Sequence, residues 1–171
     1  MKFKFFLGLL GLLALLPASH AGTIPPRYYM NLANIQGDST VKGHEHEILA
    51  TGYELQVFPN GNCFFVLQKT LDSATTELAA LVLSGSSPGA ATFLAEISSA
   101  ASRSHVVMKI EFTNLTVTSA DTEDKGVADP VPVEKVYCNF SSAVMTIYPQ
   151  TGNGQPKIVN INNNPGGGGG L

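Results

Sequence analysis

The stretch Val106-Val107-Met108-Lys109-Ile110-Glu111-Phe112-Thr113 decides the fold class, because it has the clearest alternation of apolar and polar side chains in the chain. Its even-numbered positions are all apolar, and three of its four odd-numbered positions are polar. Residues two apart in a β-strand point to the same face of a sheet. The stretch therefore predicts a strand with one buried face and one solvated face.

Strand patterns also occur on both sides of this stretch. The run at 63–67 is continuously apolar, which is typical of a strand buried on both faces. Leu115 and Val117 resume the alternation out of phase, so a bulge or bend is expected near Asn114. The polar, acidic segment 121–129 is predicted to be a surface loop. The predicted strands are 28–35, 47–57, 63–67, 106–113, 134–140 and 143–148.

One short helix is predicted after residue 71. Asp72 or Ser73 can cap its first turn, and Gly85 lies where a helix commonly ends. Apolar residues recur between them at helical spacing, namely Ala74, Leu78, Leu81 and Val82. The chain is therefore predicted to be mainly β (α+β), with the helix covering one side or end of a sheet.

The first 21 residues have the pattern of a secretory signal peptide. Lys2 and Lys4 precede an apolar run at 5–16, and Ser19-His20-Ala21 supplies small residues before Gly22. A membrane anchor is the alternative, but a spanning helix needs about 20 apolar residues. We therefore expect cleavage before Gly22 and a protein that is secreted or periplasmic, with no membrane attachment afterwards.

Composition divides the 171-residue chain into three parts: a signal peptide at 1–21, one β domain at 22–149, and a flexible Asn/Gly-rich tail at 150–171. Loss of the leader leaves 8 basic and 13 acidic residues, a net charge near −5. Nucleic acids and anionic membranes need clustered Lys and Arg, so neither is expected as a partner.

The two cysteines, Cys63 and Cys138, both follow the leader. In an oxidising compartment an even pair is more simply a disulfide than a redox or metal site. Neither belongs to a C-x-x-C pair. A Cys63–Cys138 disulfide is therefore possible, and two buried, inert thiols are the alternative.

The segment His44-Glu45-His46-Glu47 is the one cluster with the character of a metal site. In a strand, His44 and His46 would share a face and could share a cation. A metal site needs about three or four ligands, and no third is identifiable. The preferred interpretation is a solvated polar segment without a metal or other cofactor.

Enzymatic chemistry has little support in the sequence. Ser104 and His105 are adjacent and would point to opposite faces of a strand, and no G-x-S-x-G elbow is present. Asp121, Glu123 and Asp124 form an acidic run, which is usually a solvated surface. We therefore predict no catalytic residue and no cofactor-binding residue.

Four strings, in order along the chain, resemble the haemolysin-coregulated protein (Hcp) family, the tube subunit of bacterial type VI secretion. Each string alone is weak, but together they span most of the chain after the leader. They correspond to the family's opening strand and G-(E/D)-S-T turn, its polar lead into the second strand, its K-x-x-D start of the helix, and its closing strands. The strings are Leu32-Ala33-Asn34-Ile35-Gln36-Gly37-Asp38-Ser39-Thr40, Gly43-His44-Glu45-His46-Glu47-Ile48, Lys69-Thr70-Leu71-Asp72-Ser73-Ala74, and Val131-Pro132-Val133-Glu134-Lys135-Val136 running on to Tyr148.

This resemblance implies a small antiparallel β-barrel with one flanking helix and no catalytic residues. It also implies hexameric rings that stack into a hollow tube, with other copies of the chain, secretion-system components or cargo proteins as partners. Two features depart from the family: the chain has no Trp, and it carries a predicted signal peptide. The alternatives are an exported, free-standing ligand-binding β-barrel and, less favoured, a small exported hydrolase.

Overall fold

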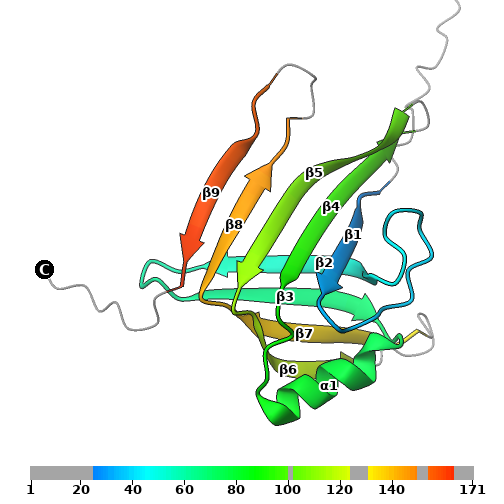
Figure 1. Cartoon of the computed structure of the whole chain (residues 1–171), viewed down its shortest axis with the longest axis vertical. Helices are drawn as coiled ribbons and strands as arrows, with labels where there is room; N and C mark the ends of the chain where they lie inside the picture. Colours follow the sequence, from blue (N-terminus) through cyan, green and yellow to red (C-terminus); the bar gives the residue numbers. More distant parts are fainter. Residues whose placement is uncertain (1–24, 100–101, 124–130, 150–153, 164–171) are drawn as a thin grey trace, which may run out of the picture.

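A computed structural model describes residues 25–99, 102–123, 131–149 and 154–163 of the chain, and these form one strongly curved antiparallel sheet with a helix at one end (Figure 1). The signal peptide predicted at 1–21 lies outside the described residues. The sheet order is β6-β7-β3-β2-β1-β4-β5-β8-β9. The strands are Arg27–Leu32 (β1), Ile48–Val57 (β2), Cys63–Thr70 (β3), Ala91–Ser99 (β4), Ser102–Thr113 (β5), Thr116–Glu123 (β6), Val133–Asn139 (β7), Ser142–Ile147 (β8) and Lys157–Asn162 (β9).

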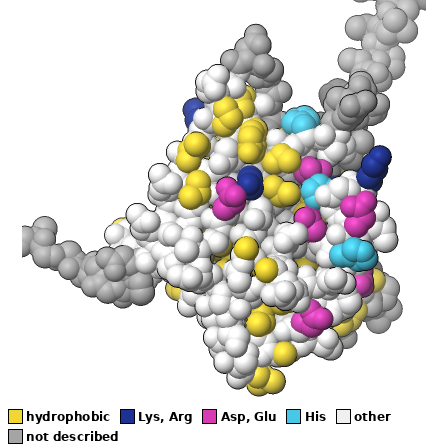
Figure 2. All heavy atoms as spheres, in the orientation of Figure 1, with side chains coloured by type: hydrophobic (Ala, Val, Ile, Leu, Met, Phe, Trp, Pro, Cys, Tyr) yellow, Lys and Arg dark blue, Asp and Glu magenta, His cyan; other side chains and the backbone are white. Residues whose placement is uncertain are grey.

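The outward face of β4, β5, β8 and β9 is turned toward the viewer in Figure 2, where hydrophobic side chains gather over these strands. The register places Val144 of β8 opposite Glu111 of β5, and Ile158 of β9 opposite Thr146 of β8, all on this face. Val144 and Ile158 are 38% and 64% exposed. Apolar and charged side chains therefore share this surface.

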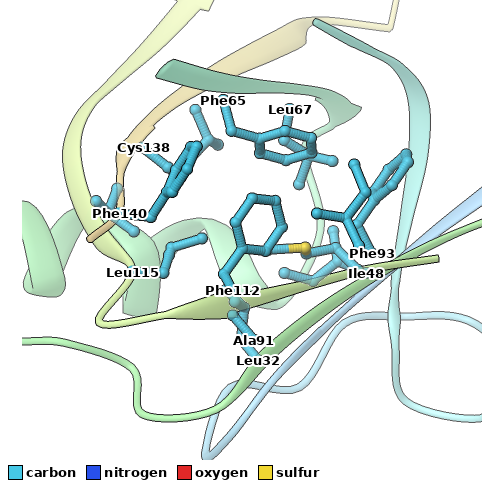
Figure 3. Close-up of a cluster of buried hydrophobic side chains, with 14 of the residues drawn as sticks. Leu32, Ile48, Phe65, Leu67, Ala91, Phe93, Phe112, Leu115, Cys138 and Phe140 are labelled. Carbon is cyan, nitrogen blue, oxygen red and sulfur yellow. The ribbon is translucent and has the colours of Figure 1, made fainter. Parts of the chain in front are cut away.

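The core lies inside the curve, where the two halves of the sheet face each other (Figure 3). Phe65 of β3 and Phe112 of β5 meet across it with ring centroids 4.9 Å apart. Phe93 packs on Phe65 from β4 at 5.2 Å, and Phe140 packs on Phe112 at 5.2 Å. Such aromatic pairs contribute about 0.5–1.5 kcal/mol each beyond the area that they bury.

The prediction of a closed barrel is wrong in one respect: the sheet has two unpaired edges. Among the described residues, β6 pairs only with β7, and β9 pairs only with β8. The helix packs against β6 at that end of the sheet (Figure 1). Alternation along a strand reveals which face is buried but not which strands pair, so closure could not be derived from it.

The single helix of the described residues, α1, spans Ala74–Ser84 and confirms the sequence prediction. The Asp72 carboxylate accepts a hydrogen bond of 3.0 Å from the Ala74 amide. Gly85 ends the helix with φ at 64°, and its amide donates to the Leu81 carbonyl. No helix in the described segments is long and apolar enough to cross a membrane.

One prediction around β5 is confirmed and one is not. The chain bends at Asn114, as expected, where φ is 51° and the bend separates β5 from β6. Residues 121–123, which were predicted to belong to a loop, form the end of β6, and residues 124–129 lie outside the described residues. The acidic residues of β6 resemble a loop in composition, yet an edge strand tolerates charged side chains on its solvated face.

Two further strands were not predicted. In β4, the inward positions include Ala91 and Ala95, which are small and give a weak hydrophobic alternation. The strand β9 lies within 150–171, where a flexible tail was expected. The Lys-Ile-Val-Asn-Ile-Asn sequence of β9 contains two Asn, which are depleted in strands, and only its Ile161 is buried.

The side chain of Asn163, which directly follows β9, connects this strand to the core through hydrogen bonds. Its Nδ2 donates to the carbonyls of Cys63 at 3.2 Å and Phe140 at 2.7 Å, and its Oδ1 accepts from the Cys63 amide at 3.2 Å. One side chain thus joins β9, the start of β3 and the turn between β7 and β8.

Replacing Asn163 by Ala is expected to lower the free energy of unfolding by about 1–3 kcal/mol, because three backbone groups lose their partner. Asn162→Ala is the matched control, since the Asn162 side chain is exposed. Urea unfolding of both variants measures the difference. Equal stability of the two variants would contradict this role for Asn163.

Candidate functional site

Three of the strings that resemble the Hcp family meet beside the start of α1. The loop between β1 and β2 folds back on itself, with the Gly37 amide donating to the His46 carbonyl at 2.8 Å. The same loop contacts the helix start: the Ser73 amide donates to the Asp38 carboxylate at 3.3 Å, and the Ser73 hydroxyl donates to the Gln36 carbonyl at 2.9 Å. Motifs that are separate in sequence therefore build one end of the molecule.

A buried lysine lies at this same end. The Lys69 ammonium is fully buried and lies 2.7 Å from the Glu134 carboxylate and 2.7 Å from the Asp72 carboxylate. It also donates to the Thr75 hydroxyl at 2.9 Å. The ammonium thus connects β3, β7 and the first turn of α1.

This cluster was not predicted, although the sequence contains a signal for it. Lys69 continues the inward-facing series of Phe65 and Leu67 on β3, and Glu134 occupies the matching inward position on β7. Two opposite charges on inward positions of neighbouring strands are uncommon unless they pair, because an unpaired buried charge is costly.

The His44 side chain is largely buried between two carboxylates. Its Nδ1 lies 2.8 Å from Glu47 and its Nε2 lies 3.0 Å from Glu96 of β4. Its ring stacks on Tyr29 of β1, with centroids 3.9 Å apart and planes inclined by 9°. The side chain is 12% exposed. His44 therefore connects the loop to β1 and β4.

Burial acts to lower the pKa of His44, but hydrogen bonds to Glu47 and Glu96 and the charges of these carboxylates outweigh it, so the pKa is raised above its ordinary value of 6.5. Figure 2 shows histidine and acidic side chains close together on the side of the molecule where the β1–β2 loop lies. These contacts thus stabilise the charged form of His44 relative to that of an ordinary histidine.

His44 and His46 do not lie in a strand, so they lack the shared strand face that the disfavoured metal alternative would need. Both precede β2, which begins at Ile48, and His46 has a left-handed backbone with φ of 65°. That conformation departs from the extended backbone of a strand, and His46 is exposed whereas the His44 side chain is largely buried. Across the described segments, no three His, Cys, Asp or Glu side chains converge as metal ligands would.

Of the residues that were weighed as catalytic groups of a hydrolase, those that the structure describes do not contact one another in the way that catalysis would need. The Ser104 hydroxyl donates to Glu96 at 2.6 Å and not to His105. Asp121 accepts from Ser119, and Glu123 pairs with Lys135 at 3.2 Å, both along the solvated edge strand β6. Asp124 lies outside the described residues. Ser104 and His105 therefore do not form a hydrogen-bonded hydroxyl–imidazole pair.

Cys63 and Cys138 are both buried and unbonded. Cys138 lies directly opposite Phe65, so Cys63 is its diagonal neighbour on the same face of the sheet. Diagonal residues are about 7–8 Å apart, whereas the Cα atoms of a disulfide are usually within about 6.8 Å. The predicted disulfide is thus not formed in the structure, because the register offsets the two strands by one pair.

We predict that neither thiol reacts with iodoacetamide in the folded protein. Burial raises the pKa of both thiols, that of Cys138 to about 12, so almost no thiolate is present. In denaturant without reductant, mass spectrometry should show two added groups. Alkylation that appears only after reduction would reveal a disulfide.

A groove of about 640 Å³ lies on the outward face of β2, β3, β6 and β7. Phe64 and Tyr137 are its aromatic members, and most of the rest are polar or charged, including Glu54, Asp121 and Lys135. An apolar, closed pocket is what a ligand-binding barrel would need. This groove is instead open to solvent and mixed in character.

Comparison with solved structures identifies the fold. Hcp1 from Salmonella typhimurium superposes with a TM-score of 0.72 at 16% identity, covering 81% of this chain and 95% of that one. A type VI secretion system effector from Yersinia pestis gives 0.67 at 18% identity, covering 79% and 98%. Hcp1 from the E. coli EAEC 042 pathovar gives 0.64 at 20% identity, covering 82% and 98%. Comparison with curated protein sequences gives no significant match.

The family itself is shown by a sequence profile. The profile described as "Type VI secretion system effector, Hcp" matches residues 29–147, more than two-thirds of the 171-residue chain. This range includes β2 to β8 and most of β1. The chain therefore belongs to the Hcp family of type VI secretion, and it is a non-enzymatic structural protein of the tube-subunit type.

Proposed function

We propose that the chain forms a closed homo-oligomeric ring, hexameric as the family resemblance implies, which stacks into a secretion tube. The observation that carries this proposal is the open sheet, whose edges β6 and β9 lie at opposite ends of the strand order. An unpaired strand edge is a template for another chain. Two different edges on one subunit give a head-to-tail contact, which closes into a ring when the rotation permits.

The exposed apolar side chains near β9 support this proposal. Ile158 and Val159 of β9 are 64% and 43% exposed, and Ile147 of β8 is 42% exposed. The register places Ile158 on the outward face and Val159 and Ile147 on the inward face, so exposed apolar side chains flank the unpaired edge on both faces of the sheet and favour association over solvation. Partners inside the secretion apparatus, or cargo, would then meet the assembled ring.

We further propose that residues 1–21 direct the export of the chain and are then removed by cleavage. The mature protein would therefore be secreted or periplasmic. Lys2, Lys4 and the apolar run at 5–16 support this step. The intact mass of the mature protein tests it, since cleavage before Gly22 gives one defined mass. A mature protein that retains residues 1–21 would contradict it.

Light scattering coupled to size-exclusion chromatography, on the chain from Gly22, tests the ring. A species of about six times the subunit mass is expected from the family architecture. Ile158→Lys should reduce it, because a charge beside an edge strand opposes pairing. Val57→Lys is the control, since Val57 is 59% exposed and lies on β2, which is paired on both sides and is not an edge strand.

A monomer at all concentrations would overturn the ring and favour the free-standing ligand-binding alternative. Equal loss of assembly in both lysine variants would show that the edge is not the contact. Reductant should leave the oligomer unchanged, because the two thiols are unbonded.

A further inference from the structure

The contacts of His44 require a specific protonation state. An ionised carboxylate only accepts hydrogen bonds, and a neutral imidazole has only one N–H to donate. Both ring nitrogens of His44 lie within 3.0 Å of a carboxylate oxygen, on Glu47 and on Glu96. Two simultaneous donations need the doubly protonated imidazolium.

Neighbouring groups donate hydrogen bonds to the Glu47 and Glu96 carboxylates, so both carboxylates act as acceptors. The other oxygen of Glu47 accepts from the Asn31 amide at 3.2 Å, and the other oxygen of Glu96 accepts from the Ser104 hydroxyl at 2.6 Å. A proton is therefore best placed on His44, the only member of this cluster that can give one to each acid. Both carboxylates are largely buried, at 13% and 10% exposure, so these charge-assisted bonds are weakly screened.

The elements packed around His44 supply few other charges. Tyr29 of β1 lies against the imidazole face, and it is 1% exposed with no hydrogen-bond partner for its hydroxyl. Arg27 of β1 lies opposite Glu96 in the strand register. From β5, Ser104 reaches Glu96 and carries no charge. The titration of the cluster therefore depends chiefly on His44 with its two carboxylates.

We propose that protonated His44 is a latch that holds the β1–β2 loop, residues 33–47, against β1 and β4, and that the latch opens as the pH rises. Loss of one proton leaves a bare ring nitrogen facing a carboxylate, which replaces an attraction by a repulsion. Freed from β4, the loop uncovers Tyr29 and loosens the pairing of Gly37 with His46. The core strands remain folded.

The direction follows from linkage. The pKa of His44 is raised in the folded protein, so the stabilisation is complete below the ordinary value of 6.5 and is lost as the pH rises through the folded pKa. The latch is therefore closed below 6.5 and opens as the pH rises through the raised pKa of His44. This pH dependence is opposite to that of a histidine switch in which protonation at low pH opens an interface.

Proton NMR titration of the histidine rings in the mature chain tests the proposal. His44 should titrate above 6.5, and Glu96→Gln should lower its pKa, because one carboxylate is replaced by an amide. Glu45→Gln is the matched control, since Glu45 is exposed and makes no contact with the His44 ring within hydrogen-bond distance. A pKa for His44 at or below 6.5 in the unaltered protein would overturn the latch.

Hydrogen exchange supplies the structural readout. After correction for the intrinsic pH dependence of exchange, the amides of Gly37 and His46 should lose protection through the His44 titration, whereas the Phe65 amide in β3 should not. His44→Gln should abolish this dependence and His46→Gln should retain it. Constant protection of the loop amides across the titration would contradict the proposal, even if His44→Gln failed to fold.

Discussion

Replacing Lys69 by Met is expected to lower the free energy of unfolding by about 3–5 kcal/mol, the cost of removing one partner from a buried ion pair. The substitution leaves the Glu134 and Asp72 carboxylates without their shared cation, and Glu134 is only 2% exposed. The Met side chain fills most of the vacated space, so the loss reports charge and hydrogen bonding more than a cavity. Equilibrium unfolding in urea, with the slope checked for a two-state transition, measures the change.

Two variants separate this explanation from a general effect of losing a lysine. Lys69→Met combined with Glu134→Leu removes both buried charges and should recover a large part of the stability, since apolar replacement of a buried pair is often neutral. Lys135→Met removes an exposed lysine that pairs with Glu123 on the surface and should change stability little. If Lys69→Met were as mild as Lys135→Met, the buried cluster would not stabilise the fold.

Strong alternation made part of the fold predictable. In the stretch 106–113, Ile110 and Phe112 are buried while Lys109 and Glu111 form an ion pair of 2.7 Å on the outward face. The helix start at Asp72 and its end at Gly85 were also readable, because each depends on a local hydrogen bond or backbone angle. Features that depend on neighbouring residues can therefore be predicted from a short stretch of sequence.

The features of the fold that the sequence did not predict depend on contacts between residues that are distant in sequence. The open edges of the sheet follow from strand pairing, which no periodicity encodes. The run at 63–67 was expected to be buried on both faces, but Phe64 is 40% exposed because nothing in the described structure covers that face fully. The strand β9 depends on Asn163, whose partners lie at Cys63 and Phe140.

The positions of His44 and His46 depend on a backbone conformation that residue spacing does not reveal. The spacing of His44 and His46 predicts a shared face only if the backbone is extended, and the left-handed conformation of His46 breaks that rule. The resemblance still indicated the right strings, because three of them meet at one end of the molecule. Their purpose there is structural: Asp38 and Gln36 contact Ser73, and Asp72 contacts Lys69.

Gly37 is the residue of the β1–β2 loop at which adding a single methyl group should lower the free energy of unfolding most. A Cβ atom there would lie 2.5 Å from the Glu47 carbonyl oxygen and 2.6 Å from the Ile48 Cα. Both are backbone atoms at the start of β2, so they cannot rotate away as a side chain could. We expect Gly37→Ala to lower the free energy of unfolding by about 3 kcal/mol or more, at the upper end of the overpacking range.

Gly43→Ala in the same loop is the matched control for Gly37→Ala. Gly43 has φ of 88° and no atom within 4 Å of a built Cβ, so its cost comes from backbone conformation alone, about 1–2 kcal/mol. Thermal and urea unfolding of the two variants therefore separate steric contact from backbone strain. Gly37→Ala should also shift the NMR signals of His46 and Glu47, because the loop must move away from β2 to admit the methyl group. An equal or smaller loss for Gly37→Ala than for Gly43→Ala would mean that the loop is not packed on β2 as closely as these distances indicate.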